Sequence, residues 1–118
     1  MKNKEIEDCE FSLISSLKFM KEVYEIIKKI PKGKVTTYSE IAKVMGIHPR
    51  KVAKILSKNK NPKIPCYRVV YSNGRVGGYK FGGKKEKIRK LRKENIKIRG
   101  DKIVNFSEKL FRFNTNQY

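Results

Sequence analysis

Two amphipathic stretches follow one another near the middle of the chain, and a break of only three residues separates them. The first covers residues 38–45, where Thr37 or Ser39 can cap the start of a helix and Gly46 can end it. The second covers about residues 49–58. A helix, a tight break and a second helix at this spacing predict a helix-turn-helix, which leaves few folds open to so short a chain.

The second of these helices has an apolar side and a basic side. Pro49 stands near its start, where a missing backbone N–H costs nothing, and Val52, Ile55 and Leu56 are expected to face the core. The side chains left on the outside are Arg50, Lys51, Lys54 and Lys58. Such a surface can bind the DNA backbone, or it can be an ordinary solvated helix face; the charge of the whole chain favours DNA.

Lys and Arg number 30 against 11 Asp and Glu, a formal net charge of +19 on 118 residues. So small a protein repels itself unless a polyanion or salt screens the charge. Nucleic acid is therefore the expected partner, with an affinity that falls steeply as salt rises. Two alternatives are a lysine-rich composition inherited from an AT-rich or thermophilic genome, and an anionic membrane surface. The membrane is disfavoured because no basic helix carries a long apolar face.

The rest of the chain has room for one small domain with one core. The remaining predicted elements are an amphipathic helix at residues 11–30, a short extended segment at 34–38, a basic helix at 84–95 and a β-hairpin at 96–104 around Gly100-Asp101. On the basic helix, Ile88, Leu91 and the stem of Lys87 are expected on the buried side.

These elements predict an α/β, mainly α fold: a single small domain with a helix-turn-helix core, an active-site loop and short strands. Residues 1–10 are expected to be a flexible N-terminus, residues 11–105 the folded domain, and residues 106–118 a loosely held C-terminal tail. A monomer is expected.

The chain has two cysteines, Cys9 and Cys66, and one histidine, His48. No signal peptide and no membrane-spanning run is present, so we expect a cytoplasmic protein, or a nuclear one in a eukaryote. In such a compartment a disulfide is not expected, and the chain lacks the ligands of a zinc site. We therefore expect neither a metal nor a cofactor.

Cys66 is either a small buried hydrophobic residue or a nucleophile. Pro65 restrains the backbone just before it, and Arg68 and nearby lysines supply a positive potential that is expected to lower the thiol pKa from about 8.5. The segment also follows the predicted DNA-binding helix. Cys9 lies among acidic residues, which disfavour its thiolate and make it a poor nucleophile.

The segment Pro65-Cys66-Tyr67-Arg68-Val69-Val70 resembles the Pro-Cys-His-Arg-Val signature of the alkylguanine–DNA alkyltransferases, also called methylated-DNA–protein-cysteine methyltransferases. The similarity extends over about residues 11–105, in order and at near-family spacing. The other matching segments are residues 23–42 with Pro31-Lys32-Gly33-Lys34-Val35-Thr36-Thr37-Tyr38, residues 49–59, Gly74-Arg75-Val76-Gly77-Gly78-Tyr79 and Lys90-Leu91-Arg92-Lys93-Glu94.

The resemblance implies a repair protein for double-stranded DNA that carries alkylated guanine. Cys66 would accept the alkyl group once, irreversibly and without a cofactor, after the base is flipped out of the duplex. Arg50 would enter the stack in place of that base from the minor groove, where little sequence is distinguished. Tyr38 would hydrogen-bond the base and help to protonate it, and Glu94 would end a hydrogen-bond relay.

The resemblance also suggests which residues surround the chemistry. Those expected to contact DNA are Arg50, Lys51, Lys54, Tyr38, Thr37 and Arg68. Those expected to shape or brace the pocket are Asn59, Pro65, Tyr67, Val69, Gly78 and Tyr79. Asn59 would brace the turn between the DNA-binding helix and the active-site loop.

Two departures from the family pattern keep a second function open. Tyr67 stands where the family has a histidine that takes the thiol proton through water, and a phenol with a pKa of about 10 is a poor base at neutral pH. The given chain also lacks the family's N-terminal domain, as do the short alkyltransferase-like proteins that bind alkylated DNA without repairing it. Those proteins usually replace the acceptor cysteine, which is retained here. A plain helix-turn-helix regulator is a third alternative, disfavoured because it leaves Cys66 and the glycine loops without a role.

Overall fold

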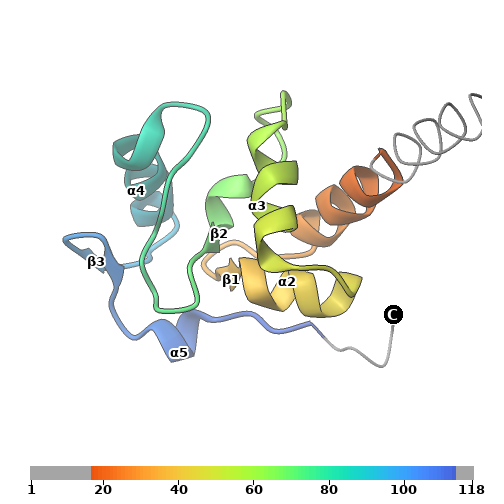
Figure 1. Cartoon of the computed structure of the whole chain (residues 1–118). Helices are drawn as coiled ribbons and strands as arrows, with labels where there is room; N and C mark the ends of the chain where they lie inside the picture. Colours follow the sequence, from red (N-terminus) through yellow and green to blue (C-terminus); the bar gives the residue numbers. More distant parts are fainter. Residues whose placement is uncertain (1–16, 114–118) are drawn as a thin grey trace, which may run out of the picture.

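The computed structural model describes residues 17–113 (Figure 1). Cys9 and the predicted N-terminal segment 1–10 lie outside that range. In chain order the elements are a helix at residues 17–28, β1 (Thr36–Thr37), α2 (Tyr38–Met45), α3 (Pro49–Ser57), the short 3-10 helix η1 (Cys66–Arg68), β2 (Val69–Val70), α4 (Gly83–Lys93), β3 (Ile98–Arg99), β4 (Lys102–Ile103) and α5 (Phe106–Lys109). The predicted α/β, mainly α fold is confirmed.

The helix-turn-helix forms as predicted from its caps. Thr37 Oγ1 accepts a hydrogen bond of 3.0 Å from the backbone N–H of Glu40, which caps α2. Gly46 ends α2 with φ of 68°, a left-handed conformation that a side chain would disfavour. His48 then caps α3, because its Nδ1 accepts from the backbone N–H of Arg50 at 3.1 Å.

The first helix was predicted over residues 11–30, of which 11–16 lie outside the described residues; among the described ones, residues 17–28 are helical. Val23, Ile27 and Ile30 are buried, as the apolar periodicity predicts. Leu17, which the same periodicity placed on the apolar side, is 57% exposed. Figure 1 shows the reason: the start of the described helix extends beyond the body that the later residues pack against.

A short parallel pairing that the sequence did not predict joins the two halves of the chain. β1 pairs with β2 in the register Thr36↔Val69 and Thr37↔Val70. Successive side chains of a strand point to opposite faces, so Val69 packs with the helix-turn-helix cluster and Val70 with a second cluster around Leu91. The interior is therefore two connected clusters rather than the single core that the length suggested.

The C-terminal elements correct one prediction. The hairpin is present, with Ile98 opposite Ile103, but its strands are two residues long. Residues 106–113 were expected to be loosely held but pack against the domain. The backbone N–H of Val35 donates to Lys109 O at 2.9 Å, and the backbone N–H of Phe111 donates to Val35 O at 2.6 Å. Phe113 is buried in the core. The contacts are long-range and follow no helical or strand period, so the sequence pattern does not show them.

Candidate functional site

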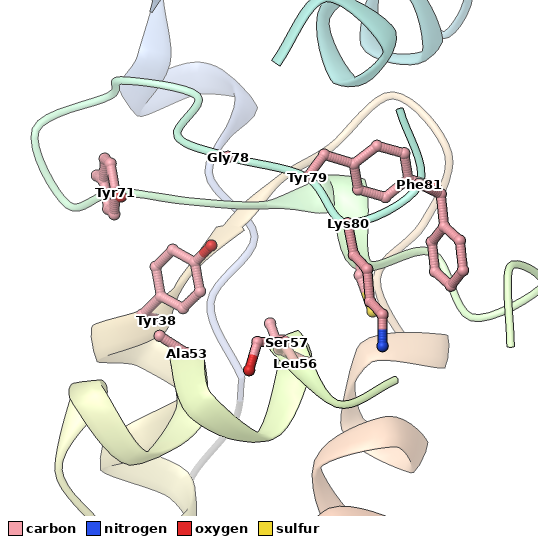
Figure 2. A pocket seen from close by; sticks show the side chains of 10 residues that line it. Tyr38, Ala53, Leu56, Ser57, Tyr71, Gly78, Tyr79, Lys80 and Phe81 are labelled. Carbon is pink, nitrogen blue, oxygen red and sulfur yellow. The ribbon is translucent and has the colours of Figure 1, made fainter. Parts of the chain in front are cut away.

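The loop of residues 71–82, which connects β2 to α4, is called the glycine loop below. Cys66 lies at a cavity of about 380 Å³ between the helix-turn-helix and the glycine loop (Figure 2). That volume lies in the range of roughly 300–1,000 Å³ typical of small-ligand pockets. The lining residues are Tyr38, Ala53, Leu56, Ser57, Cys66, Tyr71, Gly78, Tyr79, Lys80 and Phe81. α2, α3, η1 and the loop that precedes α4 thus each contribute to one pocket.

Cys66 is nearly buried, with an exposed fraction of 8% for the whole residue. The side-chain amide of Asn59, itself 2% exposed, donates a hydrogen bond of 3.2 Å to Sγ. Burial raises the pKa of the Cys66 thiol, and the hydrogen bond from Asn59 and the charge of Lys87 oppose the rise without overcoming it. The expected lowering of the thiol pKa is therefore wrong in direction.

Arg68 does not supply the positive potential predicted for it, because Glu94 neutralises it. Its guanidinium forms two hydrogen bonds to the Glu94 carboxylate, Nε to Oε1 at 3.0 Å and Nη2 to Oε2 at 2.6 Å. The third donor, Nη1, bonds to Ile30 O at 2.8 Å. Both side chains are largely buried, so Arg68 ties η1 to the end of α4 and to Ile30, just after the first helix.

Tyr67 belongs to the same network. Its hydroxyl donates a hydrogen bond of 2.8 Å to Glu94 Oε2. Burial, followed by the hydrogen bond to Glu94, raises the pKa of Tyr67, so its phenol stays protonated at neutral pH. Burial alone would raise the pKa of Glu94, but the bonds from Arg68 and Tyr67 outweigh it and lower that pKa. Tyr67 is thus a donor to Glu94 and not a base.

Tyr38 contributes a phenol to the pocket from the first residue of α2. Burial, together with Tyr71 and Cys66, raises the pKa of Tyr38 to about 12. Its ring lies 5.6 Å from that of Tyr71, centroid to centroid. Figure 2 shows the hydroxyl pointing into the space between α3 and the glycine loop. A phenol that keeps its proton is a hydrogen-bond donor to whatever occupies the cavity.

Asn59 holds the chain that connects α3 to Cys66. Its Oδ1 accepts from the backbone N–H of Asn61 at 2.9 Å, and its Nδ2 donates to Asn61 O at 3.0 Å. Pro65 follows this turn directly before η1. The amide of Asn59 therefore contacts both the turn and the thiol, as its predicted bracing role requires.

Of the three residues predicted to wall the pocket beyond the thiol, Gly78 and Tyr79 line the cavity from the glycine loop. Val69, by contrast, is fully buried in β2 and is not a lining residue. The hydroxyl of Tyr79 is the one buried side-chain oxygen without a hydrogen-bond partner among residues 17–113. Its ring meets those of Tyr67 and Phe81 edge to face, at 6.2 Å and 5.7 Å between centroids.

The predicted DNA-contacting residues separate into two groups. Arg50, Lys51 and Lys54 are exposed on α3, and Arg50 lies one turn before the pocket residue Ala53. Lys51 places its ammonium 4.6 Å from the centroid of the Phe19 ring. Thr37, by contrast, is buried, and its hydroxyl serves as the α2 cap described above.

Sequence analysis missed Lys87, which α4 places wholly inside the protein with an exposed fraction of 1%. The stem alone was expected to be buried, yet the ammonium donates to Val69 O at 2.7 Å and to Gly78 O at 3.1 Å. Burial lowers the pKa of Lys87 to about 7. Its place one turn before Leu91 already indicated a buried stem. The two carbonyls that accept from its ammonium lie 18 and 9 positions away in the chain, so no local pattern indicates them.

Within residues 17–113, no three side chains among His, Cys, Asp and Glu are grouped so that they could hold a metal ion. No helix in that range is both long and apolar enough to cross a bilayer.

The fold and the site define a class: a helix-turn-helix domain with a cysteine in a pocket beside its second helix. Residues 18–96 match the family model "6-O-methylguanine DNA methyltransferase, DNA binding domain". The chain belongs to this family, which confirms the resemblance found in the sequence.

Two curated relatives show the extent of the similarity. The bifunctional methyltransferase/endonuclease of Thermoplasma volcanium is 41% identical over 106 residues, which cover 86% of this chain and 31% of that protein. The methylated-DNA–protein-cysteine methyltransferase of Methanothermobacter thermautotrophicus is 42% identical over 83 residues, 70% of this chain and 47% of that protein. The chain therefore spans less than half the length of either relative.

Solved structures give the same result. S. pombe Atl1, in complex with damaged DNA containing O6-carboxymethylguanine, superposes with a TM-score of 0.71 at 26% identity, covering 80% of this chain and 95% of that one. The O6-methylguanine-DNA methyltransferase of Pyrococcus kodakaraensis gives a TM-score of 0.61 at 38% identity, covering 66% of this chain and 46% of that one.

Proposed function

We propose that this chain repairs DNA by taking a flipped, alkylated guanine into the Cys66 cavity and accepting the alkyl group on Sγ. The observation that carries the proposal is the position of the thiol: Cys66 lines a cavity whose other wall is α3, the helix that exposes Arg50. Double-stranded DNA carrying alkylated guanine is the proposed partner, and the protein is proposed to bind it as a monomer.

In the transfer step the Cys66 thiolate attacks the alkyl carbon. The Sγ–carbon bond forms as the bond from that carbon to the guanine oxygen breaks, and guanine leaves with the electron pair and takes up one proton. The thioether that remains is stable, so each molecule reacts once. No cofactor is required by this balance of atoms and electrons.

Tyr38 and Arg50 have separate roles in this proposal. The Tyr38 phenol, whose pKa of about 12 keeps it protonated, donates a hydrogen bond to the bound base and favours its departure as the neutral form. Arg50 occupies the gap that the extruded nucleotide leaves, which offsets a few kcal/mol of lost stacking. Lys51 and Lys54 contact the phosphate backbone.

A second candidate function is a sensor that binds alkylguanine in DNA without removing the alkyl group and recruits other repair factors. Two observations favour it. Tyr67 keeps its proton, donates a hydrogen bond to Glu94 and cannot act as a base for Cys66. Atl1, solved in complex with damaged DNA containing O6-carboxymethylguanine, is matched over 95% of its chain.

Mass spectrometry after incubation with an O6-methylguanine duplex separates the two functions. Transfer adds one methyl in place of one hydrogen to the peptide containing Cys66, and Cys66→Ala abolishes the gain while leaving lesion binding intact. Tight binding to the lesion with no gain in mass identifies the sensor and contradicts the transfer proposal. Binding to one DNA sequence regardless of the lesion would contradict both.

A further inference from the structure

α4 carries positive charge that the proposed repair reaction does not use. Its eleven residues include seven Lys or Arg and one Glu, and each of these cations except Lys87 is exposed or half-buried. The proposed contacts of Lys51 and Lys54 with the DNA backbone come from α3 instead. Figure 1 shows η1 and β2 between α3 and α4. So dense a positive charge is unfavourable unless an anion balances it, which points to a separate partner for α4.

The second half of α4 borders a cavity of about 230 Å³, called the α4 cavity below. Its lining residues are Lys32, Tyr67, Arg89, Lys90, Lys93 and Glu94, and none of them lines the cavity at Cys66. Lys32 comes from the loop between the first helix and β1, and Tyr67 comes from η1, so three parts of the chain enclose this space. The volume is below the roughly 300 Å³ at which small-molecule pockets begin, so it suits one small ionic group.

Four of the six side chains that line the α4 cavity are cationic. Within residues 17–113, no ion pair involves Lys32, Lys90 or Lys93. Arg89 is paired with Glu86 one turn before it, but both side chains are partly exposed. Ion pairs of this kind are weak, so the guanidinium of Arg89 is available to a stronger anion.

The single carboxylate in the lining, that of Glu94, does not repel an anion, because it is already neutralised. It accepts two hydrogen bonds from Arg68 and one from Tyr67, and its side chain is nearly buried. The ring of Tyr67 lies beside a cation, since the ammonium of Lys90 is 5.4 Å from its centroid. The charges left to act on an occupant of the α4 cavity are therefore positive.

We propose that the α4 cavity is a second DNA-binding site, which takes a backbone phosphate from outside the stretch of duplex that α3 binds. A phosphodiester is a small anion that accepts hydrogen bonds from Lys and Arg, which are the side chains that line the cavity. The phosphate belongs either to a flank of the same duplex or to a second duplex. A phosphate contact reads no base, so this site binds DNA irrespective of sequence and of the lesion.

The test removes two charges from the α4 cavity without touching the core. Lys32→Gln is combined with Lys93→Gln, and both of these lysines are exposed. The matched control combines Lys97→Gln with Lys102→Gln, which removes the same charge from exposed positions of the β3–β4 hairpin outside the cavity. Circular dichroism establishes that both double variants are folded. Any difference between them then reports on where the charge was removed.

Fluorescence anisotropy measures the binding of each protein to an unmodified duplex of about 30 base pairs at several salt concentrations. Each phosphate contact that is lost makes the slope of log K against log salt less steep by about 0.9. We expect the cavity variant to lose about one contact and to bind about threefold to tenfold more weakly than the control variant. A slope and an affinity equal to those of the control variant overturn the proposal.

A short unmodified duplex of about one helical turn distinguishes the two sources of the phosphate, with the stoichiometry measured by analytical ultracentrifugation. If a flank of the same duplex supplies it, the weakening caused by the cavity variant disappears on the short duplex. If a second duplex supplies it, the unsubstituted protein binds two short duplexes and the cavity variant binds one.

A weakening that persists on the short duplex, with one duplex bound per protein, would make the α4 cavity part of the α3 interface and overturn a second site. Both duplexes are unmodified, so these outcomes do not depend on whether Cys66 accepts an alkyl group. The transfer function is tested separately by the mass of the peptide containing Cys66.

Discussion

The hydroxyl of Tyr67 and the carboxylate of Glu94 are joined by a hydrogen bond of 2.8 Å, in which Tyr67 donates. Glu94 also accepts two hydrogen bonds from Arg68, so this carboxylate holds together the side chains of the two residues that follow Cys66. The arrangement keeps η1 in place but gives Cys66 no base. The relay predicted to end at Glu94 therefore lacks a member that can accept the thiol proton.

Restoring that member is the most direct test of transfer. Tyr67→His places an imidazole with a pKa near 6.5 beside Cys66, and Glu94 remains available to orient it. We expect transfer to an O6-methylguanine duplex to speed up by roughly 10²-fold in single-turnover experiments, the low end of what a general base contributes. Tyr67→Phe is the control that removes the bond to Glu94 without adding a base. No gain would mean that the thiolate forms without a base at this position.

The buried ion pair of Arg68 and Glu94 makes stability depend on pH. Because the pKa of Glu94 is lowered in the folded protein, its contribution is complete above the unfolded value of about 4.3 and is lost as pH falls through the lower folded value. Glu94→Gln should cost about 3 kcal/mol near neutral pH, since Arg68 loses its charged partner.

Urea unfolding at several pH values measures this contribution. The gap between the unsubstituted protein and Glu94→Gln should narrow as the solution becomes more acidic than about pH 4. Glu25→Gln, which disturbs an exposed pair with Lys28, should cost about 0.5 kcal/mol or less at neutral pH. A difference in unfolding free energy that stays the same at all pH values would contradict a stabilising Arg68–Glu94 ion pair.

Replacing Arg50 should weaken binding to DNA that carries the lesion more than binding to unmodified DNA. Arg50→Ala is expected to keep the fold and to weaken binding to an O6-methylguanine duplex about tenfold more than binding to the unmodified duplex, because only the flipped state leaves a gap to fill. Lys58→Ala removes an equal charge from the end of α3 and should weaken both duplexes alike. Equal losses for both variants in fluorescence anisotropy would count against Arg50 as the inserted side chain.

Lys80 should favour adducts that carry negative charge. Its side chain extends from the glycine loop toward the end of α3 and lines the cavity (Figure 2). An ammonium at this position attracts a carboxylate, so Lys80→Gln should lower affinity for an O6-carboxymethylguanine duplex about threefold to tenfold relative to the O6-methylguanine duplex. Taking the ratio of the two affinities removes any loss of binding to the DNA backbone, because that loss is the same for both duplexes. An unchanged ratio would show that the Lys80 charge does not reach the adduct.

Local signals predicted much of this fold correctly. Thr37, Gly46 and Pro49 set the bounds of α2 and α3 through caps and backbone conformation, which depend on neighbours in the chain. The hairpin around Gly100 was predicted for the same reason, as its turn is encoded by adjacent residues. The motif around Cys66 was recognisable because its residues are contiguous.

Three features depend on residues far apart in the chain, and the sequence pattern indicated them wrongly or not at all. Arg68 meets Glu94 across 26 positions, which turns an expected source of positive potential into a neutralised pair. Val35 pairs with Phe111 only because the C-terminal segment returns to β1. The charge of Lys87 acts on Cys66 because α4 packs against η1.

By itself the sequence determined the family, the helix-turn-helix and Cys66 as the candidate nucleophile, since each is encoded by side chains within a few residues of one another. Only the tertiary structure decided how readily the thiol of Cys66 ionises. Burial raises the pKa of Cys66, Asn59 and Lys87 oppose that rise, and Arg68 has no part in it. The physical reason is that ionisation responds to desolvation and to charges within a few ångströms in space, and neither follows from distance along the chain.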